Sequence, residues 1–491
     1  MPSMSTVKRF DLMQGARQAM LDAGFLPDIP ANAQKEAANL VAASATGAGI
    51  RDLRSLPWSS IDNDESRDLD QIEVAEALPG GHCRVRVGIA DVDALVRQGS
   101  ALDGYAAHNT CTVYTGAAVF PMLPESLSTD RTSLGEGMDR LAMVVEMDVD
   151  PQGNVVRADV YQAAVRNSAK LAYDGVGAWL EGSRPAPAKV ASRPVLQEQL
   201  RLQDRAARAM KTVRHARGAL DLETIEARAV VKDGSVLGIE LTKKSPARAL
   251  IEDFMIAANG AIARFLEGRG ASSIRRVVKA PERWQRIVAL AKRVDETLPA
   301  EASSRALSAF LDRRKVAAPD TFADLSLSVV KLMGPGEYAL ELPGQAYDGH
   351  FGLAVTDYTH STAPNRRFAD LVTQRLVKAA LGHAPPAYGN DDLATIAARC
   401  TQKENDARKV ERTTRKQADA VFLGDRIGQE FDAIVTGAAD KGTFARLLDP
   451  PAEGRIVQGE AGLDVGDRVR VRLVATEPVR GFIDFVRARS A

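Results

Sequence analysis

Residues 60–73 read SIDNDESRDLDQIE, and six of these fourteen residues carry a carboxylate. Such a concentration of acidic side chains in a short segment is typical of a site that holds a cation. Three interpretations are open at this point: a structural calcium loop, an acid-rich surface loop, and the metal centre of an enzyme.

The calcium interpretation has some support, because the twelve residues from Asp62 to Glu73 place oxygen-bearing side chains at loop positions 1, 3, 5, 7, 9 and 12. Position 6 of an EF-hand loop needs glycine for its sharp turn, and here that position is Arg67. Pro57 and Trp58 also stand where the entering helix should be. The sequence therefore disfavours an EF-hand.

The enzyme interpretation starts from phosphodiester cleavage, in which divalent ions activate a water and stabilise the leaving oxygen. Asp68 and Asp70 are two residues apart, so from an extended segment they point the same way, and Asp62 reaches them from across the turn. If this segment stood alone, an acid-rich surface loop would be the favoured interpretation.

A second segment, residues 349–375, reads GHFGLAVTDYTHSTAPNRRFADLVTQR. Arg366 and Arg367 follow a proline-containing turn and open a predicted helix, which carries Asp370 and Arg375 further along. A helix N-terminus with guanidinium groups binds phosphate through its free amides and through bidentate charge. The alternative is a surface arginine pair without a binding role.

Together the two segments resemble the hallmarks of the ribonuclease II/ribonuclease R family, whose catalytic RNB domain has the patterns S-I-D-x-x-x-x-x-D-L/F-D-D and H-F-T-S-P-I-R-R-Y-x-D-L. The chain matches them as Ser60-Ile61-Asp62, as Asp68-Leu69-Asp70, and as HSTAPNRRFADL at 360–371. Further family-like pieces follow in the right order: IADVDALV at 89–96, VFPMLPESLS at 119–128, GALDLE at 218–223, IEDFMIAAN at 251–259 and HFGLAV at 350–355.

The resemblance implies a processive, hydrolytic 3′ to 5′ exoribonuclease that threads single-stranded RNA to a buried site and releases nucleoside 5′-monophosphates. It implies Mg²⁺ as the cofactor, with Mn²⁺ as an alternative and one or two ions bound. The expected partner is RNA with a single-stranded 3′ end, and the expected state is a monomer. The main rival is a non-catalytic RNA-binding protein with a degenerate RNB site.

Roles follow for individual residues as what the resemblance implies. Asp62, Asp68 and Asp70 bind the metal and orient the attacking water, and Asp70 matches the position on which cleavage depends most. Arg366 grips the scissile phosphate, with Arg367 and Arg375 as weaker candidates. Three further residues contact the RNA 3′ end: Tyr114 by stacking, and Glu252 and Glu411 at the terminal ribose. Asp64, Glu65 and Glu73 are expected to be solvated or structural.

The chain departs from the family at Gln71, where the pattern has a fourth Asp. An amide oxygen can coordinate a cation but brings no charge, so Gln71 is a weaker metal ligand, and we expect Gln71→Asp to keep or raise activity at low magnesium. A second departure lies upstream, where about sixty residues leave no room for the two cold-shock modules that the family usually carries there. Fewer modules predict a wider channel mouth and tolerance of structured RNA with a 3′ overhang.

With 491 residues, the chain is expected to form several domains in an α+β multidomain fold. Residues 1–49 predict a small helical domain, with helix-turn-helix as one alternative and a plain packing element as the other. Residues 50–425 predict a mixed α/β RNB domain with a Pro/Ala-rich exposed loop at 183–193. Residues 426–491 predict about five short strands with turn glycines, typical of an OB-type barrel, and they resemble the S-one type of RNA-binding module.

Composition narrows the remaining possibilities. The net charge is zero, so any RNA must be bound by local patches, and residues 264–293 with nine Lys or Arg against two Glu are a candidate patch. A solvated helix face is a near-even alternative for that segment. The three cysteines show no paired spacing, and no apolar run is long enough for a membrane span or signal peptide. These features predict a cytoplasmic protein.

Overall fold

The computed structural model describes residues 10–488 except 48, 224–225, 233–234, 243–244, 346, 383 and 440–441. Residues 1–9 of the predicted helical domain therefore lie outside the described residues. Its two helices are α1 (Leu12–Asp22) and α2 (Ala31–Asn39), and the Asp11 carboxylate caps α1 by accepting from two backbone amides. Because α1 packs against α12 (Asn390–Leu423) and α2 against α3 (Ala101–Asn109), the two helices cover different parts of the protein. The helix-turn-helix assignment stays a prediction.

A seven-stranded sheet forms the centre of the catalytic region, with the strand order β1-β8-β7-β4-β3-β2-β9. Its strands are antiparallel except at the two edges, where β1 runs parallel to β8 and β2 parallel to β9. The strands are β1 (Arg51–Asp52), β2 (Ser59–Asp62), β3 (Gln71–Ala77), β4 (Cys83–Ala90), β7 (Asp139–Val149), β8 (Val155–Arg166) and β9 (Ala169–Ala172). The first five residues of β3 are buried on both faces, so polar residues at its start lie inside the protein.

Helices pack around this sheet and share its hydrophobic core. Two of them begin with a proline in the first turn, where the missing amide donor costs nothing. The helices are α4 (Tyr173–Leu180), α5 (Ala188–Ala191), α6 (Pro194–Arg217), α7 (Pro246–Gly268) and α11 (Phe368–Leu381). The predicted loop at 183–193 is wrong in part, because α5 turns Val190 into the core.

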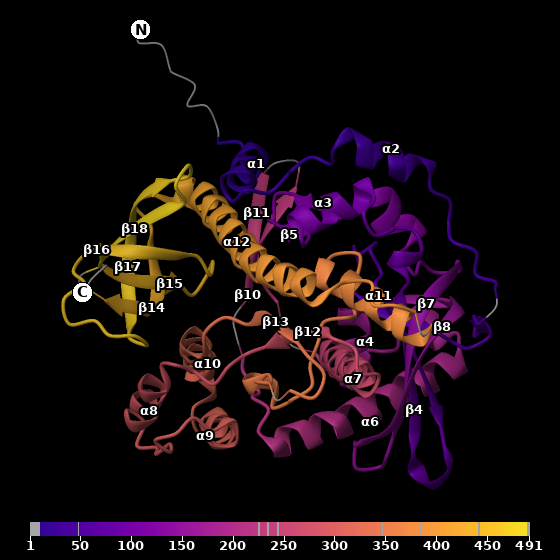
Figure 1. The fold of residues 1–491 in the computed structure, drawn as a ribbon. Helices are drawn as coiled ribbons and strands as arrows, with labels where there is room; N and C mark the ends of the chain where they lie inside the picture. The colour runs from indigo at the N-terminus through magenta and orange to yellow at the C-terminus, as the bar shows by residue number, and fades with distance from the viewer. Residues whose placement is uncertain are drawn as a thin grey trace.

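The C-terminal part is a closed barrel with the strand order β14-β15-β16-β18-β17, which confirms the predicted five-stranded OB-type fold. Its strands are β14 (Glu430–Ala439), β15 (Gly442–Leu447), β16 (Glu453–Gln458), β17 (Arg468–Glu477) and β18 (Phe482–Arg487). Figure 1 shows the long helix α12 running from this barrel across the catalytic region.

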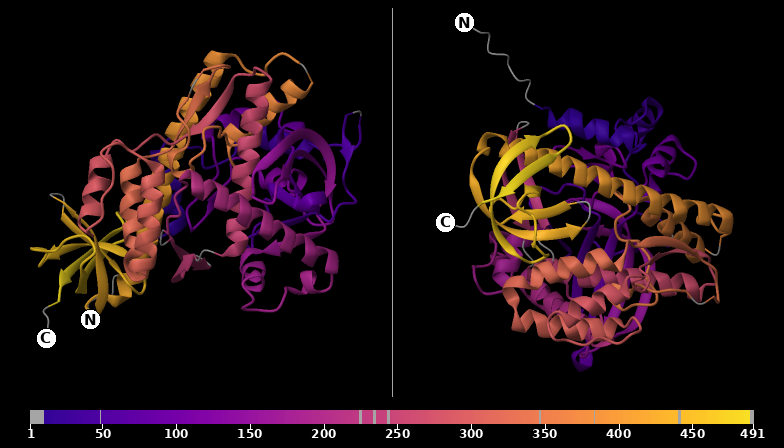
Figure 2. Two further views of the ribbon diagram at one scale, coloured as in Figure 1. Left: turned by 90° about the horizontal axis from the view of Figure 1, so that it is seen from below. Right: turned by 90° about the vertical axis from the view of Figure 1, so that its left-hand side faces the viewer.

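A three-helix group lies against the barrel, as both views of Figure 2 show. Arg446 in the barrel donates to Asp324 at 2.9 Å, and Arg293 pairs with Asp464 at 3.3 Å. The group consists of α8 (Trp284–Lys292), α9 (Ser304–Ala317) and α10 (Pro319–Met333). These ion pairs tie the barrel to the catalytic region.

The remaining strands form three two-stranded ribbons: β5 (Val113–Tyr114) with β6 (Val119–Phe120), β10 (Glu226–Lys232) with β11 (Ser235–Thr242), and β12 (Ser273–Val277) with β13 (Glu337–Glu341). Short 3₁₀ turns lie at Pro79–Gly81, Val92–Ala94, Phe351–Leu353 and Gly424–Arg426, and a π turn at Leu127–Arg131. No helix in the described part of the chain is both long enough and apolar enough to cross a lipid bilayer.

Candidate active site

Residues 110–112 lie beside residues 366–368 at the start of α11, although the two segments are far apart in the sequence. The backbone amide of Thr112 donates to the carbonyl of Arg366 at 3.0 Å, and the amide of Phe368 donates to the carbonyl of Thr110 at 2.8 Å. Cys111 and Arg367 form an isolated antiparallel bridge between these two bonds. This pairing fixes the ribbon that carries Tyr114 beside the two arginines.

The acidic segment meets the arginine segment at Asp70, which is 2 % exposed. Its Oδ2 accepts from Arg366 Nε at 3.3 Å, and its Oδ1 accepts from the backbone amide of Asn365 at 3.0 Å. Burial raises the pKa of Asp70 to about 7, although the Arg366 charge and the Asn365 amide lower it. The two motifs, 296 residues apart in the sequence, therefore form one site.

Asp68 and Asp62 extend the acidic side of this site. Asp68 Oδ2 lies 3.5 Å from the Tyr114 hydroxyl, which donates to it. Burial raises the pKa of Asp68, and the negative charge of Asp62 adds to that rise. Asp62 Oδ1 accepts from the backbone amide of Asn63 at 2.7 Å and from the Ser66 hydroxyl at 3.0 Å. The three aspartates thus form a row: the charge of Asp62 raises the pKa of Asp68, and the charge of Asp68 raises the pKa of Asp70.

A cavity of about 270 Å³ opens beside this row and contains four of the residues predicted to bind RNA. Tyr114 is 43 % exposed there, and its backbone amide donates to Glu411 Oε1 at 3.3 Å. Burial raises the pKa of Glu411. The four residues are Tyr114, Arg366, Arg367 and Glu411, of which Glu411 comes from α12.

Glu252 does not join this group. It lies on α7 with an exposed side chain, and it is absent from the residues that line the cavity. Its neighbour Asp253 is buried instead and pairs with Arg214 of α6. The ribose-contacting role of Glu252 stays a prediction that this geometry does not support.

The arginines of the second motif have different surroundings. Arg366 makes one ion pair and its side chain is 42 % exposed, whereas Arg367 pairs with the fully buried Asp370 at 2.8 Å. Arg375 is buried among Asp93, Asp103, the Tyr388 hydroxyl and the Val96 carbonyl, so all of its nitrogens have partners. Arg375 is therefore a structural residue rather than a phosphate ligand.

Gln71 and Glu73 lie at the start of β3, on one face of the strand because they are two residues apart. Gln71 is 9 % exposed, and Glu73 is fully buried. Burial and the charge of Asp62 raise the pKa of Glu73 well above its usual value. Glu73 is thus not solvated, and its carboxylate has no hydrogen-bond partner among the described residues, so of the two predicted alternatives the structural one remains.

Within the described ranges, no three His, Cys, Asp or Glu side chains converge closely enough to enclose a metal ion by themselves. The row of carboxylates with the Gln71 amide still suits magnesium, which keeps several waters and binds through one or two carboxylates plus substrate phosphates. The residues present fit an open site of this kind.

The predicted basic patch at 264–293 is not a single surface. Arg275 is buried against Glu341, and Arg276 pairs with Glu404 of α12 at 2.5 Å. Both arginines lie on β12, which β13 and α12 cover, so their charges are neutralised inside the protein. The prediction failed because these acidic partners are 66 and 128 residues away in the sequence.

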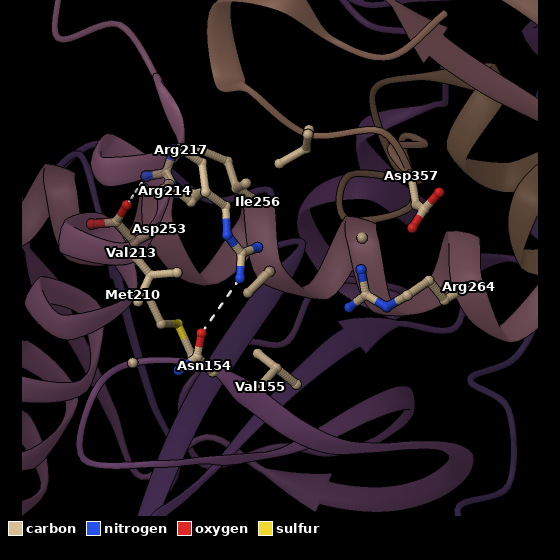
Figure 3. A pocket seen from close by; sticks show the side chains of 14 residues that line it. Asn154, Val155, Met210, Val213, Arg214, Arg217, Asp253, Ile256, Arg264 and Asp357 are labelled. Atoms are coloured by element: carbon tan, nitrogen blue, oxygen red, sulfur yellow. Dashed lines mark hydrogen bonds and ion pairs between the residues drawn. The ribbon is translucent and has the colours of Figure 1, made fainter. Parts of the chain in front are cut away.

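A second cavity, of about 160 Å³, lies between α6, α7 and the β7–β8 turn. Figure 3 shows Arg217 donating to Asn154 on one side of it and Arg264 beside Asp357 on the other. None of the predicted site residues lines this cavity, so the candidate active site is the one beside Asp70.

The fold and the site together define a class: an α/β domain with an acidic–arginine centre, joined by a long helix to an OB-type barrel. The RNB domain matches residues 50–383, and the RNase II-type exonuclease C-terminal S1 domain matches residues 429–488. The chain therefore belongs to the RNB family. The predicted domain limits of 1–49, 50–425 and 426–491 stay predictions, since the RNB match ends before α12.

Several known proteins are similar to this chain. Ribonuclease R of Thermotoga maritima is 30 % identical over 89 % of the chain and 65 % of its own length. Ribonuclease R of Escherichia coli is also 30 % identical, over 89 % of the chain and 57 % of its own length. The chain therefore spans less than two thirds of these curated relatives.

Solved structures show the same fold. Mycoplasma genitalium RNase R in complex with ribose methylated single-stranded RNA has a TM-score of 0.88 at 23 % identity, covering 97 % of this chain and 78 % of that one. Yeast Ssd1, a pseudonuclease, has a TM-score of 0.72 at 18 % identity, covering 90 % of this chain and 55 % of that one. The fold therefore occurs in a ribonuclease and in a pseudonuclease, so only the site residues bear on activity.

Proposed function

We propose that this protein is a hydrolytic 3′ to 5′ exoribonuclease that degrades single-stranded RNA to nucleoside 5′-monophosphates. The observation that carries the proposal is the contact between Arg366 and Asp70 beside the cavity that Tyr114 and Glu411 line. A nuclease site needs carboxylates for the cation and a guanidinium for the phosphate within reach of one another, and this pair supplies both.

The side chains divide the work by their chemistry. Arg366 uses only its Nε in the pair with Asp70, so its Nη groups remain to hold the scissile phosphate and the charge that develops on it. The half-exposed ring of Tyr114 offers a stacking surface for a terminal base without sequence preference. The Glu411 carboxylate, on the cavity wall, accepts from a ribose hydroxyl, which separates RNA from DNA.

Members of the RNB family generally depend on a divalent metal. We assign Mg²⁺, with Mn²⁺ as the alternative, to Asp62, Asp68 and Asp70, with Gln71 as a neutral oxygen ligand. When bound, the metal supplies activation of a water and stabilisation of the leaving oxygen. The protein contributes the orientation: the Asn365 amide and Arg366 fix the Asp70 carboxylate, and Tyr114 fixes Asp68.

The test is a 5′-labelled RNA oligomer incubated with magnesium. Stepwise shortening from the 3′ end with release of 5′-mononucleotides supports the proposal, and chelation of the metal should stop the reaction. An Asp70→Asn variant serves as the inactive control, and a DNA oligomer of the same sequence should stay intact. Shortening from the 5′ end, or internal cuts, would reject the proposal.

The second candidate function is RNA binding without cleavage, which Gln71 favours because it removes one charge from the acidic centre. In that case, the protein retains the labelled RNA on a filter but leaves its length unchanged at every magnesium concentration.

We further propose tolerance of structured RNA. A hairpin with a single-stranded 3′ tail tests it, because an enzyme with a narrow channel mouth stalls many nucleotides before the stem. Shortening up to or into the stem is the result that supports the wider entrance.

A further inference from the structure

Arg248 brings a second guanidinium to the acidic row, from a different element than Arg366. It lies in the first turn of α7, where the Ser245 hydroxyl accepts from its backbone amide at 3.3 Å. Its Nη2 donates to the side-chain oxygen of Asn63 at 3.0 Å. Asn63 directly follows Asp62 and donates its own backbone amide to the Asp62 carboxylate at 2.7 Å. Hydrogen bonds therefore connect Arg248 to a predicted metal ligand.

Tyr173 fixes the direction of the Arg248 side chain. Ala172 is in register with Asp62 where β9 runs parallel to β2, and Tyr173 follows as the first residue of α4. The Arg248 guanidinium carbon lies 4.4 Å from the centre of the Tyr173 ring, within the range of a cation–π contact. Arg248 is thus held between Asn63 and Tyr173, at the Asp62 end of the row.

The guanidinium of Arg248 has donors to spare. Nη2 is its only nitrogen with a hydrogen-bond partner among the described residues, and no described carboxylate forms an ion pair with it. Nε is buried, whereas Nη1 is accessible to solvent. The side chain of Arg248 is partly exposed, as are those of Asp62, Asn63 and Tyr173. An arginine whose single side-chain bond goes to a neutral amide keeps its charge available for an anion such as phosphate.

The two ends of the acidic row have different surroundings. At the Asp70 end, Arg366 faces the cavity beside Tyr114, which receives the last nucleotide under the proposed function. Arg248 does not line that cavity and lies instead at the Asp62 end. An RNA strand whose 3′ nucleotide fills the cavity, and whose scissile phosphate meets Arg366, therefore leaves across the row toward Arg248.

We propose that Arg248 binds the internucleotide phosphate one linkage upstream of the scissile phosphate. The inference rests on the proposed function, because that function places the 3′ end of the RNA in the cavity. Nη1 donates to the phosphate oxygens, while Nη2 stays on Asn63 and the Tyr173 ring supports one face of the guanidinium. Such a contact positions RNA of any sequence.

The experiment measures the affinity for a short RNA that carries one neutral methylphosphonate linkage, by competition in the Asp70→Asn background, which prevents cleavage. A neutral linkage at the second position from the 3′ end should weaken binding about tenfold, because a charge-assisted hydrogen bond is lost. Arg248→Gln should bind unmodified RNA about tenfold more weakly, and the same modification should then cost less than about twofold. A neutral scissile linkage should weaken binding equally with and without Arg248→Gln, because Arg366 is present in both.

Salt dependence is a readout that a purely structural role of Arg248 would not change. For a single strand, each phosphate contact adds about 0.7 to the slope of log affinity against log salt concentration, so Arg248→Gln should make that slope about 0.7 shallower. Arg201→Gln is the matched control and should leave the slope unchanged. Its guanidinium carbon also lies over a ring of α4, 5.4 Å from the centre of Trp179, but Arg201 makes no hydrogen bond to the acidic segment within the described residues.

Two further variants keep the inference testable if Arg248→Gln does not fold. Arg248→Met keeps an apolar stem against Tyr173 and should behave as the glutamine variant does. Arg248→Lys keeps the charge without the planar fork, so it should retain the salt slope of the parent protein.

Two outcomes would overturn the inference. A neutral second linkage that costs the Asp70→Asn parent less than about twofold in affinity would show that no residue binds that charge, and this arm needs no variant at position 248. Equal losses on that modification before and after Arg248→Gln would assign the phosphate to another residue.

The outcome is independent of RNA cleavage. A protein that binds the second linkage through Arg248 but, with Asp70 intact, leaves RNA uncut would contradict the proposed function and support this inference. A protein that shortens RNA from the 3′ end and shows equal losses before and after Arg248→Gln would do the reverse.

Discussion

Two arginines, one just before α11 and one in the middle of that helix, have opposite surroundings. At the start, Arg366 makes a single ion pair with Asp70, and its side chain is 42 % exposed on the cavity wall. Two turns into the helix, Arg375 is 4 % exposed and has a partner for every nitrogen. Charge alone therefore does not indicate a binding residue, whereas spare donors that face a cavity do.

The buried ion pairs of Arg375 belong to a closed network, which also includes Lys378. Lys378 donates to Asp91 and Asp93, both at 2.9 Å. Breaking one member of such a buried network leaves a charge without a counter-charge. Arg366 is not enclosed in this way: its side chain is 42 % exposed, and its charge acts on Asp68 as well as on Asp70. We therefore expect variants at the start of α11 to lose activity and variants further along the helix to lose stability.

The largest effect is expected at the open end, for Asp70→Asn. The substitution keeps the shape of the side chain but removes the carboxylate that faces Arg366, so the cleavage rate should fall by at least about 10⁴-fold. Single-turnover release of mononucleotides measures it. The melting temperature should change little, because burial already disfavours the charge. If Asp70→Asn retained a tenth of the cleavage rate, the Asp70 carboxylate would not be required for cleavage.

The next effect is expected in the closed network, for Arg375→Met. Removing the guanidinium leaves the buried Asp103 without its cationic partner and takes one of two cationic partners from Asp93, so the free energy of unfolding should fall by about 3–5 kcal/mol. Denaturant unfolding measures the loss. An unchanged unfolding midpoint would show that the ion pairs of Arg375 do not stabilise the fold.

A smaller effect is expected for Tyr114→Ala. The loss of one stacked base should cost about 1–3 kcal/mol in RNA binding. Tyr114→Phe is the control, since it keeps the ring and removes only the long 3.5 Å contact with Asp68. Competition binding in the Asp70→Asn background measures both, and equal losses in the two variants would indicate that the hydroxyl, and not the ring, matters.

The smallest effect is a pH dependence at His360, which lines the open cavity and whose Nδ1 lies 2.8 Å from the Tyr338 hydroxyl. Burial and the nearby arginine charges lower the pKa of His360 well below its usual 6.5. Below pH 6.5, the unfolded chain therefore binds a proton that the folded chain does not, so acidification destabilises the fold by up to about 1.4 kcal/mol per pH unit. Melting curves between pH 7 and pH 5 should show a smaller drop for His360→Asn, and equal drops would assign the acid sensitivity elsewhere.

Local pattern predicted much of the fold. Turn glycines between short strands predicted the five-stranded barrel, and the sequence pattern before residue 49 predicted helices. The proximity of Asp70 and Arg366 came from the resemblance to a family, since no local rule joins residues 296 positions apart.

The sequence did not predict which charged side chains are buried. Glu73 was expected to be solvated or structural, and because both faces of β3 are covered it lies in the core, which leaves the structural alternative. Arg275 and Arg276 belong to a basic segment, but their partners Glu341 and Glu404 come from distant elements. In each case the burial of the charge depends on an element that lies elsewhere in the chain.

The most direct test of the difference between the two arginines compares Arg366→Lys with Arg375→Lys, because lysine keeps the charge and loses the planar fork. Single-turnover RNA cleavage and melting temperature are measured on both. We predict that Arg366→Lys loses about 10²-fold in rate at an unchanged melting temperature, and that Arg375→Lys melts lower but cleaves within twofold of the unaltered protein. A similar pattern of losses in the two variants would contradict the account.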